Sequence, residues 1–323
     1  MSPLPAGERP QVRQAERLLP ALRRSDELRL LQSSVMAYSL ASLVRRTRNP
    51  RHKQIVIRDI RPPQMLASDL YRSSYARVCA AWEAAIPRIM AEYERSVPVR
   101  DASANPSENI QNLSDSPSDL GDLFRILGDE LTRLIIDIIP ELRDWTFRTD
   151  RWHRDQWRGA VLSATGVDIE TILYASGTPT TVGETLAWNT ALIKDVSDQT
   201  RQRISSAVFA GLQARKPARE VAAEIRDAVG MSRRRSQLIA SDQLAKLASG
   251  LDSERMHDAG ITQFKYRHSG KVHARKWHRA RDGKLYELES GEQVEGPDDI
   301  ARDDMPGIPP YCGCRKQAVL TFD

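Results

Sequence analysis

Apolar side chains recur at every third or fourth position between residues 119 and 145, and no other pattern constrains the fold as strongly. The repeat consists of Leu120, Phe124, Leu127, Leu131, Leu134, Ile138, Leu142 and Trp145. One side of an α-helix collects such positions, so this helix must bury that side against other helices. Ser116, Pro117 and Asp119 predict its start, because they suit an N-cap, a first-turn proline and a capping acid. The repeat is short and contains Pro140, which favours packing within the chain over an oligomer seam.

Weaker repeats of the same period predict further helices. Their ranges are 1–48 after a proline-rich lead, 63–97, 195–214, 217–230 and about 232–259. Pro87 should kink or interrupt the second of these helices, and Gly230 should end the fourth. The stretch from Gly166 to Gly183 is rich in Ser, Thr, Gly and Pro, which predicts a connection with little regular structure.

Strand patterns are few and short. Gln54–Ile60 is one candidate, and Ile261–His268 alternates between apolar and polar residues. The expected fold class is therefore mainly α with a small α+β carboxy-terminal domain. The amino-terminal half should be helical, and short antiparallel strands should lie near the C-terminus.

Composition suggests where the chain divides. Residues 98–118 shift to Asp, Ser, Asn and Pro, which is typical of a linker or a long surface loop. We expect a basic helical region over 1–100, a polar linker over 101–118, a helical middle domain over 119–230 and an α+β domain over 231–323. A chain of 323 residues is long enough for two or three such parts.

Charge is distributed unevenly along the chain. Residues 1–61 hold 13 Lys or Arg against 5 Asp or Glu, whereas residues 101–150 hold 11 acids against 4 bases. The densest basic run consists of Arg45, Arg46, Arg48, Arg51 and Lys53. Such a run can neutralise phosphates, but no base-reading motif follows it. A solvated face or a contact with an acidic protein surface is therefore favoured over direct DNA binding.

Several classes of protein are excluded by simple features. The first twenty residues lack the apolar core of a secretory signal. The most apolar stretch, Leu131–Pro140, is interrupted by Arg133 and Asp137 and is far shorter than the roughly 20 residues of a membrane span. Three cysteines, two of them one residue apart, do not form a disulfide framework, which predicts a reducing cytoplasm during synthesis.

An ordered series of motifs occupies the last third of the chain. A basic helix start, Ser232–Arg235, leads into Leu238–Leu247, and the turn Ala259-Gly260-Ile261 precedes the alternating segment. Arg275, His278 and Asp282-Gly283 follow, and the series closes with Pro309-Pro310-Tyr311-Cys312-Gly313-Cys314-Arg315. In order and spacing, over about residues 195–320, it resembles the phage head morphogenesis proteins, the phage Mu F-like minor head protein family.

The resemblance implies a non-enzymatic minor head (capsid) protein of a tailed bacteriophage or prophage. Such a protein is associated with the portal and acts in head morphogenesis and DNA packaging or delivery. The implied partners are the portal protein, the major capsid protein and packaged double-stranded DNA, without a membrane. The implied location is the virion head, after synthesis in the cytoplasm of the bacterial host.

Four residues form the one cluster of metal-ligand types in the sequence: His273, His278, Cys312 and Cys314. Two His and two Cys suit tetrahedral zinc, so a structural zinc ion is the cofactor to consider. Alternatively, the two cysteines are buried small residues and His278 holds a turn by a hydrogen bond. The second functional hypothesis is a DNA-binding or DNA-cleaving enzyme with a zinc-stapled His/Cys domain. We assign no catalytic residue, since a general base is not recognisable.

Overall fold

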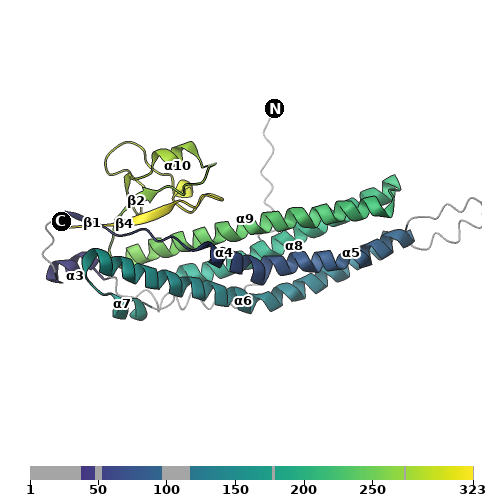
Figure 1. Cartoon of the computed structure of the whole chain (residues 1–323), viewed down its shortest axis with the longest axis horizontal. Helices are drawn as coiled ribbons and strands as arrows, with labels where there is room; N and C mark the ends of the chain where they lie inside the picture. The colour runs from purple at the N-terminus through teal and green to yellow at the C-terminus, as the bar shows by residue number, and fades with distance from the viewer. Residues whose placement is uncertain (1–37, 48–52, 97–116, 177–178, 273, 323) are drawn as a thin grey trace, which may run out of the picture. The chain divides into compact units, whose positions relative to one another are not determined.

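The computed structural model describes residues 38–47, 53–96, 117–176, 179–272 and 274–322. Ser39–Asp323 form one compact unit, to which this description is confined (Figure 1). Its described helices are α3 (Leu40–Thr47), α4 (Gln64–Leu70), the π-helical turn η1 (Tyr71–Tyr75), α5 (Ala76–Ser96), α6 (Pro117–Thr165), α7 (Glu170–Ala175), α8 (Thr180–Ala214), α9 (Ala218–Asp258), α10 (Lys276–Ala280) and the 3-10 turn η2 (Arg302–Asp304). Its described strands are β1 (Gln54–Val56), β2 (Gln263–Arg267), β3 (Leu285–Glu287) and β4 (Arg315–Thr321). The predicted fold class, mainly α with a small sheet, is confirmed.

Helices α5, α6, α8 and α9 pack along one another and bury the main apolar core (Figure 1). The α6 repeat lies in this core, with Leu134 partly and the other predicted members fully buried, so its predicted packing within the chain is confirmed. Two buried tryptophans also satisfy their indole N–H groups. Trp82 donates to Oγ of Ser197 at 3.3 Å, and Trp145 donates to the carbonyl oxygen of Leu66 at 2.8 Å.

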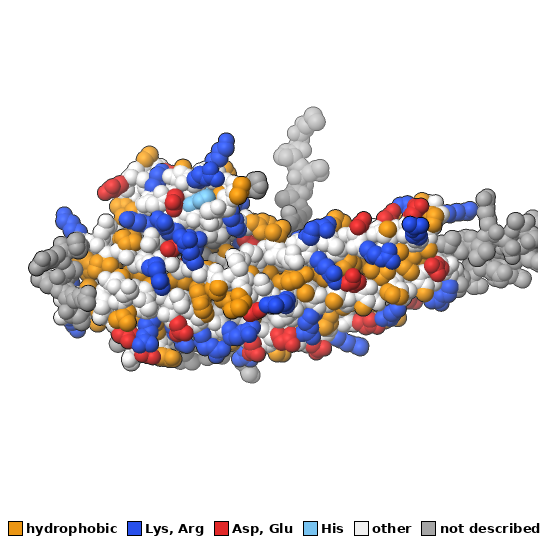
Figure 2. Space-filling view, viewed as in Figure 1, with side chains coloured by type: hydrophobic (Ala, Val, Ile, Leu, Met, Phe, Trp, Pro, Cys, Tyr) orange, Lys and Arg blue, Asp and Glu red, His pale blue; other side chains and the backbone are white. Residues whose placement is uncertain are grey.

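Ion pairs on the surface connect neighbouring helices. Arg88 on α5 lies 2.8 Å from a carboxylate oxygen of Glu130 on α6. Arg77 pairs with Glu141, and Glu83 pairs with Arg233 on α9. Figure 2 shows basic and acidic side chains interspersed along the helices on the face in view. In the part of the chain that the structure describes, no helix is both long and apolar enough to cross a membrane.

The predicted helix end at Gly230 and the predicted irregular stretch 166–183 are wrong, and Pro87 does not interrupt its helix. Helix α5 continues through Pro87 to Ser96, and α9 continues through Gly230. The stretch 166–183 contains α7 and the first turn of α8. A glycine inside a helix costs only about 1 kcal/mol relative to alanine, and burial of the apolar Val229 beside Gly230 offsets that cost. The expected boundary between residues 230 and 231 therefore lies inside a helix.

The sheet has four antiparallel strands in the order β1-β4-β2-β3. The predicted strand 261–268 is present as β2. The predicted strand 54–60 shortens to β1, whose Val56 pairs with Val319 of β4. The N–H of Ile57 extends this pairing to the carbonyl oxygen of Ala318 at 3.0 Å. The early part of the chain therefore supplies an edge strand to a sheet whose other strands come from the C-terminal region.

Helix α9 also contacts the sheet and the loop that precedes β4. Lys316, on β4, donates to Oγ of Ser253 at 2.7 Å, and Oγ of Ser249 donates to the carbonyl oxygen of Pro306 at 2.6 Å. The approach is so close at Gly307 that an added Cβ atom would lie 2.4 Å from Cβ of Ser249. One helix thus belongs to both the bundle and the small sheet.

A buried polar cluster joins α6 to α9. Arg255 donates to Oδ1 of Asp150 at 2.6 Å and to Nδ1 of His153, and Nε2 of His153 lies 2.9 Å from Oδ1 of Asp252. A guanidinium only donates hydrogen bonds, so Nδ1 of His153 is an unprotonated acceptor and the proton of the neutral ring is on Nε2. Burial lowers the pKa of His153 and, together with the Arg255 charge, outweighs the opposing carboxylates of Asp252 and Asp150.

This arrangement predicts a loss of stability in mild acid. The folded-state pKa of His153 is below the ordinary value of about 6.5, so the unfolded chain takes up a proton first as the pH falls. The free energy of unfolding should fall by up to about 1.4 kcal/mol per pH unit below that value. His153→Gln should reduce this dependence, measured by urea denaturation at about pH 7.5 and about pH 5.5.

His257→Gln is the matched control, because His257 lies on the surface of α9 with 72% of its side chain exposed. It should leave the pH dependence of the parent protein intact. A pH dependence that is equal in His153→Gln and the parent would contradict the proposed neutral state of His153.

Candidate metal centre

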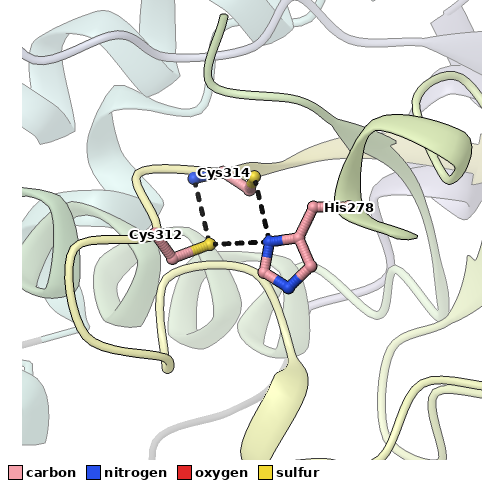
Figure 3. Close-up of side chains that lie close together, drawn as sticks. All are labelled: His278, Cys312 and Cys314. Atoms are coloured by element: carbon pink, nitrogen blue, oxygen red, sulfur yellow. Dashed lines mark hydrogen bonds between the residues drawn. The ribbon is translucent and has the colours of Figure 1, made fainter. Parts of the chain in front are cut away.

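Three side chains from two neighbouring segments form the candidate site. Helix α10 carries His278, and the loop entering β4 carries Cys312 and Cys314. Gly313, between the cysteines, has φ +67°, and Tyr311 has φ +58°. These left-handed conformations turn the backbone sharply, so both sulfur atoms lie on the side facing α10 (Figure 3).

The three ligand-type atoms converge closely. Nδ1 of His278 lies 3.4 Å from Sγ of Cys312 and 3.6 Å from Sγ of Cys314 (Figure 3). All three side chains are buried, and one donor atom from each lies within 4.8 Å of the others. The N–H of Cys314 also donates to Sγ of Cys312 at 3.4 Å. In the described part of the chain, this is the group of His, Cys and acidic residues that could hold a metal ion.

The second ring nitrogen of His278 determines the tautomer. Nε2 lies 2.8 Å from Oδ1 of Asp304, and a carboxylate only accepts, so Nε2 carries the proton. The lone pair of Nδ1 is therefore directed at the two sulfur atoms. Burial favours protonation of Asp304, but hydrogen bonds from His278 and Arg281 outweigh it and lower the pKa of the Asp304 carboxyl group.

The two cysteine side chains differ in acidity, because their pKa values shift in opposite directions. A hydrogen bond from the Cys314 thiol lowers the pKa of Cys312, and the Gly307 and Cys314 N–H groups add to the effect although burial opposes it. The same pairing raises the pKa of Cys314, and burial adds to that rise. The site therefore stabilises one thiolate at Cys312, the form in which sulfur binds metals.

Asp304 connects the site to its surroundings, and the sequence patterns did not identify it. Its Oδ2 accepts from Nε1 of Trp277 at 3.0 Å and from Arg281 at 2.5 Å. Arg281 is buried and also lies 3.5 Å from Asp298. Arg281 is one of several basic residues in the sequence around His278, but its charge is paired within the protein. Arg275 and His278 likewise bond internally, the former to the carbonyl oxygen of Pro310 at 3.4 Å.

The remaining predicted site residues lie elsewhere or cannot be placed. His273, expected as a fourth ligand, and Arg48 and Arg51 of the basic run lie outside the described residues. Arg45 and Arg46 are exposed on α3, and Lys53 is exposed just before β1. The Arg45 guanidinium lies 5.9 Å from the centre of the Phe322 ring, beyond the end of β4. The described basic residues therefore flank the β1–β4 edge of the sheet.

Asp304→Ala should destabilise the region around the candidate site. It removes the oxygen atoms that accept hydrogen bonds from His278, Trp277 and Arg281, and it leaves the positive charge of the buried Arg281 paired, among the described residues, only with Asp298. The free energy of unfolding should fall by about 2–4 kcal/mol. Asp303→Ala, at the exposed neighbouring position, is the matched control and should change stability by less than about 0.5 kcal/mol. Thermal unfolding followed by circular dichroism measures both. Equal stability of the two variants would show that Asp304 does not support the site.

Comparison with known proteins agrees with the resemblance in the sequence. Residues 202–317 match the family described as Phage Mu protein F like protein. This range contains the end of α8, all of α9 and most of the sheet, together with His278, Cys312 and Cys314. The suspected family is thus confirmed for this region.

Among curated proteins, an uncharacterized protein of Haemophilus influenzae is 29% identical over 157 residues. The aligned part is 48% of this chain and 33% of that protein, so the chain matches about a third of its relative's length. No solved structure matches the chain.

Proposed function

We propose that the chain is a head-morphogenesis protein of a tailed bacteriophage or prophage, because residues 202–317 match the Phage Mu F-like family. In this proposal it is a non-enzymatic minor head protein that binds the portal, contacts the major capsid protein and acts in DNA packaging or delivery. It is made in the host cytoplasm and incorporated into the virion head. The family match carries this proposal.

The fold supports an assembly role. The family region is not a separate module, since α9 packs on α5 and α8 while it also contacts β4. A partner bound to the bundle would therefore be linked mechanically to the sheet through one continuous helix. On the face in view, charged side chains of both signs lie along the bundle, which suits specific polar contacts with other proteins more than a single strong field for nucleic acid (Figure 2).

Co-assembly tests the proposal directly. The full chain is to be expressed with the portal and major capsid proteins encoded beside it, and the particles isolated by sedimentation. We expect a few copies of the chain in each particle. We also expect the chain to be retained in particles that contain the major capsid protein but no packaged DNA. A chain that stays outside the particles, or that alone cleaves DNA with a divalent metal ion, would instead support the DNA-processing enzyme.

The basic run is the proposed contact with packaged DNA or an acidic portal surface. Reversing Arg45, Arg46 and Lys53 to Glu changes the charge by −6 through three exposed residues near one edge of the sheet. We expect about a tenfold loss of incorporation or DNA retention, equivalent to about 1.4 kcal/mol. Particle composition and DNA content per particle are the measurements.

A variant with the same charge change controls for net charge. Arg133, Arg219 and Arg226 are exposed on α6 and α9, away from the β1–β4 edge. Reversing them should leave incorporation near the parent level, provided circular dichroism shows both variants folded. Equal losses in the two variants would mean that total charge, not the basic run, governs assembly.

A further inference from the structure

The geometry points to a zinc site formed by Nδ1 of His278 and the Sγ atoms of Cys312 and Cys314. This inference concerns the described residues and does not rest on the proposed head function. His273, which lies outside them, has no part in it. A fourth donor would complete the coordination.

The distances fit zinc in a tetrahedral site. Bond lengths of about 2.3 Å to sulfur and about 2.0–2.1 Å to nitrogen place the two ligand atoms about 3.6 Å apart at the tetrahedral angle. The two nitrogen–sulfur distances are 3.4 and 3.6 Å. Because all three ligand atoms also lie within 4.8 Å of one another, one cation can lie between them.

A hydrogen bond at Nδ1 of His278 accounts for only one of the two sulfur contacts. Nδ1 of His278 has a single lone pair, yet two sulfur atoms approach it at similar distances. Only one thiol can donate its proton to that lone pair, so the second thiol must donate elsewhere, as the Cys314 thiol does to Cys312. A cation accepts electron pairs from all three atoms at once, so it explains why both sulfur atoms converge on the same nitrogen.

The surrounding groups suit a metal-bound form of these ligands. Asp304 accepts a hydrogen bond from the N–H at Nε2 at 2.8 Å, the carboxylate–histidine arrangement that orients metal-binding imidazoles. The N–H of Cys314 donates to Sγ of Cys312, which favours a thiolate there. The hydroxyl of the buried Tyr266 interacts with Cys314. Its ring packs edge-on against His278, with 5.8 Å between ring centres.

The Cys-x-Cys spacing is explained by the backbone between the two ligands. Gly313 adopts φ +67°, and an added Cβ atom would lie 3.2 Å from the Lys271 side chain. Nζ of Lys271 holds the same turn by donating to the carbonyl oxygen of Tyr311 at 2.8 Å. The turn is anchored to α9 as well, because the N–H of Tyr311 donates to Oδ1 of Asp242 at 2.6 Å. Zinc would then link α10 to a loop already fixed on the bundle.

The test is metal analysis of the full, tag-free chain purified from zinc-supplemented cells. We expect close to one zinc per chain by mass spectrometry of the metals. Replacement of zinc by Co²⁺ should produce a thiolate-to-cobalt charge-transfer absorption and the visible spectrum of a tetrahedral ion. Cys312→Ser and Cys314→Ser should each reduce that absorption by about half or abolish it, since each removes one of the two thiolates.

Cys79→Ser is the matched control, because Cys79 is also buried but lies on α5, near Ser236 of α9. It should retain full zinc content and the full cobalt absorption. Asp304→Asn keeps all three ligands but weakens the orientation of His278 and the pairing of Arg281, so we expect about a 10- to 100-fold loss of zinc affinity. This variant keeps the inference testable if a cysteine variant fails to fold.

Three results would overturn the inference. One is a folded parent protein with zinc near background and no cobalt absorption after loading. Another is cobalt absorption that persists when both Cys312 and Cys314 are serine. The third is a disulfide between these cysteines in protein purified from the reducing cytoplasm. None of these results depends on whether the chain enters phage heads, so the two proposals fail separately.

Discussion

Helix α9 packs against the bundle with its apolar residues and hydrogen-bonds to the sheet and its entering loop with polar ones, so both parts of the fold depend on this one helix. Val221, Ile225, Leu244 and Leu251 are buried with the bundle core. Asp242, Ser249 and Ser253 bond to the loop entering β4 or to the strand itself. A break in α9 would therefore separate two regions that otherwise share few direct supports.

Local patterns were sufficient where structure depends on nearby residues. The α6 repeat predicted both the helix and its buried side, since both follow from the spacing of apolar residues. The end expected at Gly230 was wrong because burial of neighbours such as Val229, a tertiary effect, outweighs the low helix propensity of glycine. The pairing of β1 with β4 joins residues more than 250 positions apart, as at Gln54 and Thr321. No local signal in the sequence specifies that pairing.

Residue type made part of the candidate site recognisable in advance. Cysteine is rare in the chain, so Cys312 and Cys314, together with the earlier His273 and His278, were an evident set of possible metal ligands. Asp304 was not evident, because four acidic residues, Asp298, Asp299, Asp303 and Asp304, lie close together in the sequence. Only the fold shows that Asp304 reaches His278 while the exposed Asp303 does not. The sequence also left the internal pairing of Arg281 hidden, although that pairing decides how basic the surface near His278 is.

The buried side chains of His153 and His278 have different partners at Nδ1. This difference explains why His153 completes a hydrogen-bond network and why His278 suits a cation. In both rings Nε2 faces a carboxylate, Asp252 for His153 and Asp304 for His278, so in both Nδ1 is the acceptor. At His153 the donor of Arg255 meets that lone pair, which completes a network between α6 and α9. At His278 the same lone pair faces two sulfur atoms, which are weak donors and, as thiolates, strong ligands. A positive charge is supplied to the first ring by a side chain of the protein, and in the proposed zinc site the second ring and the two cysteines would bind one from solution.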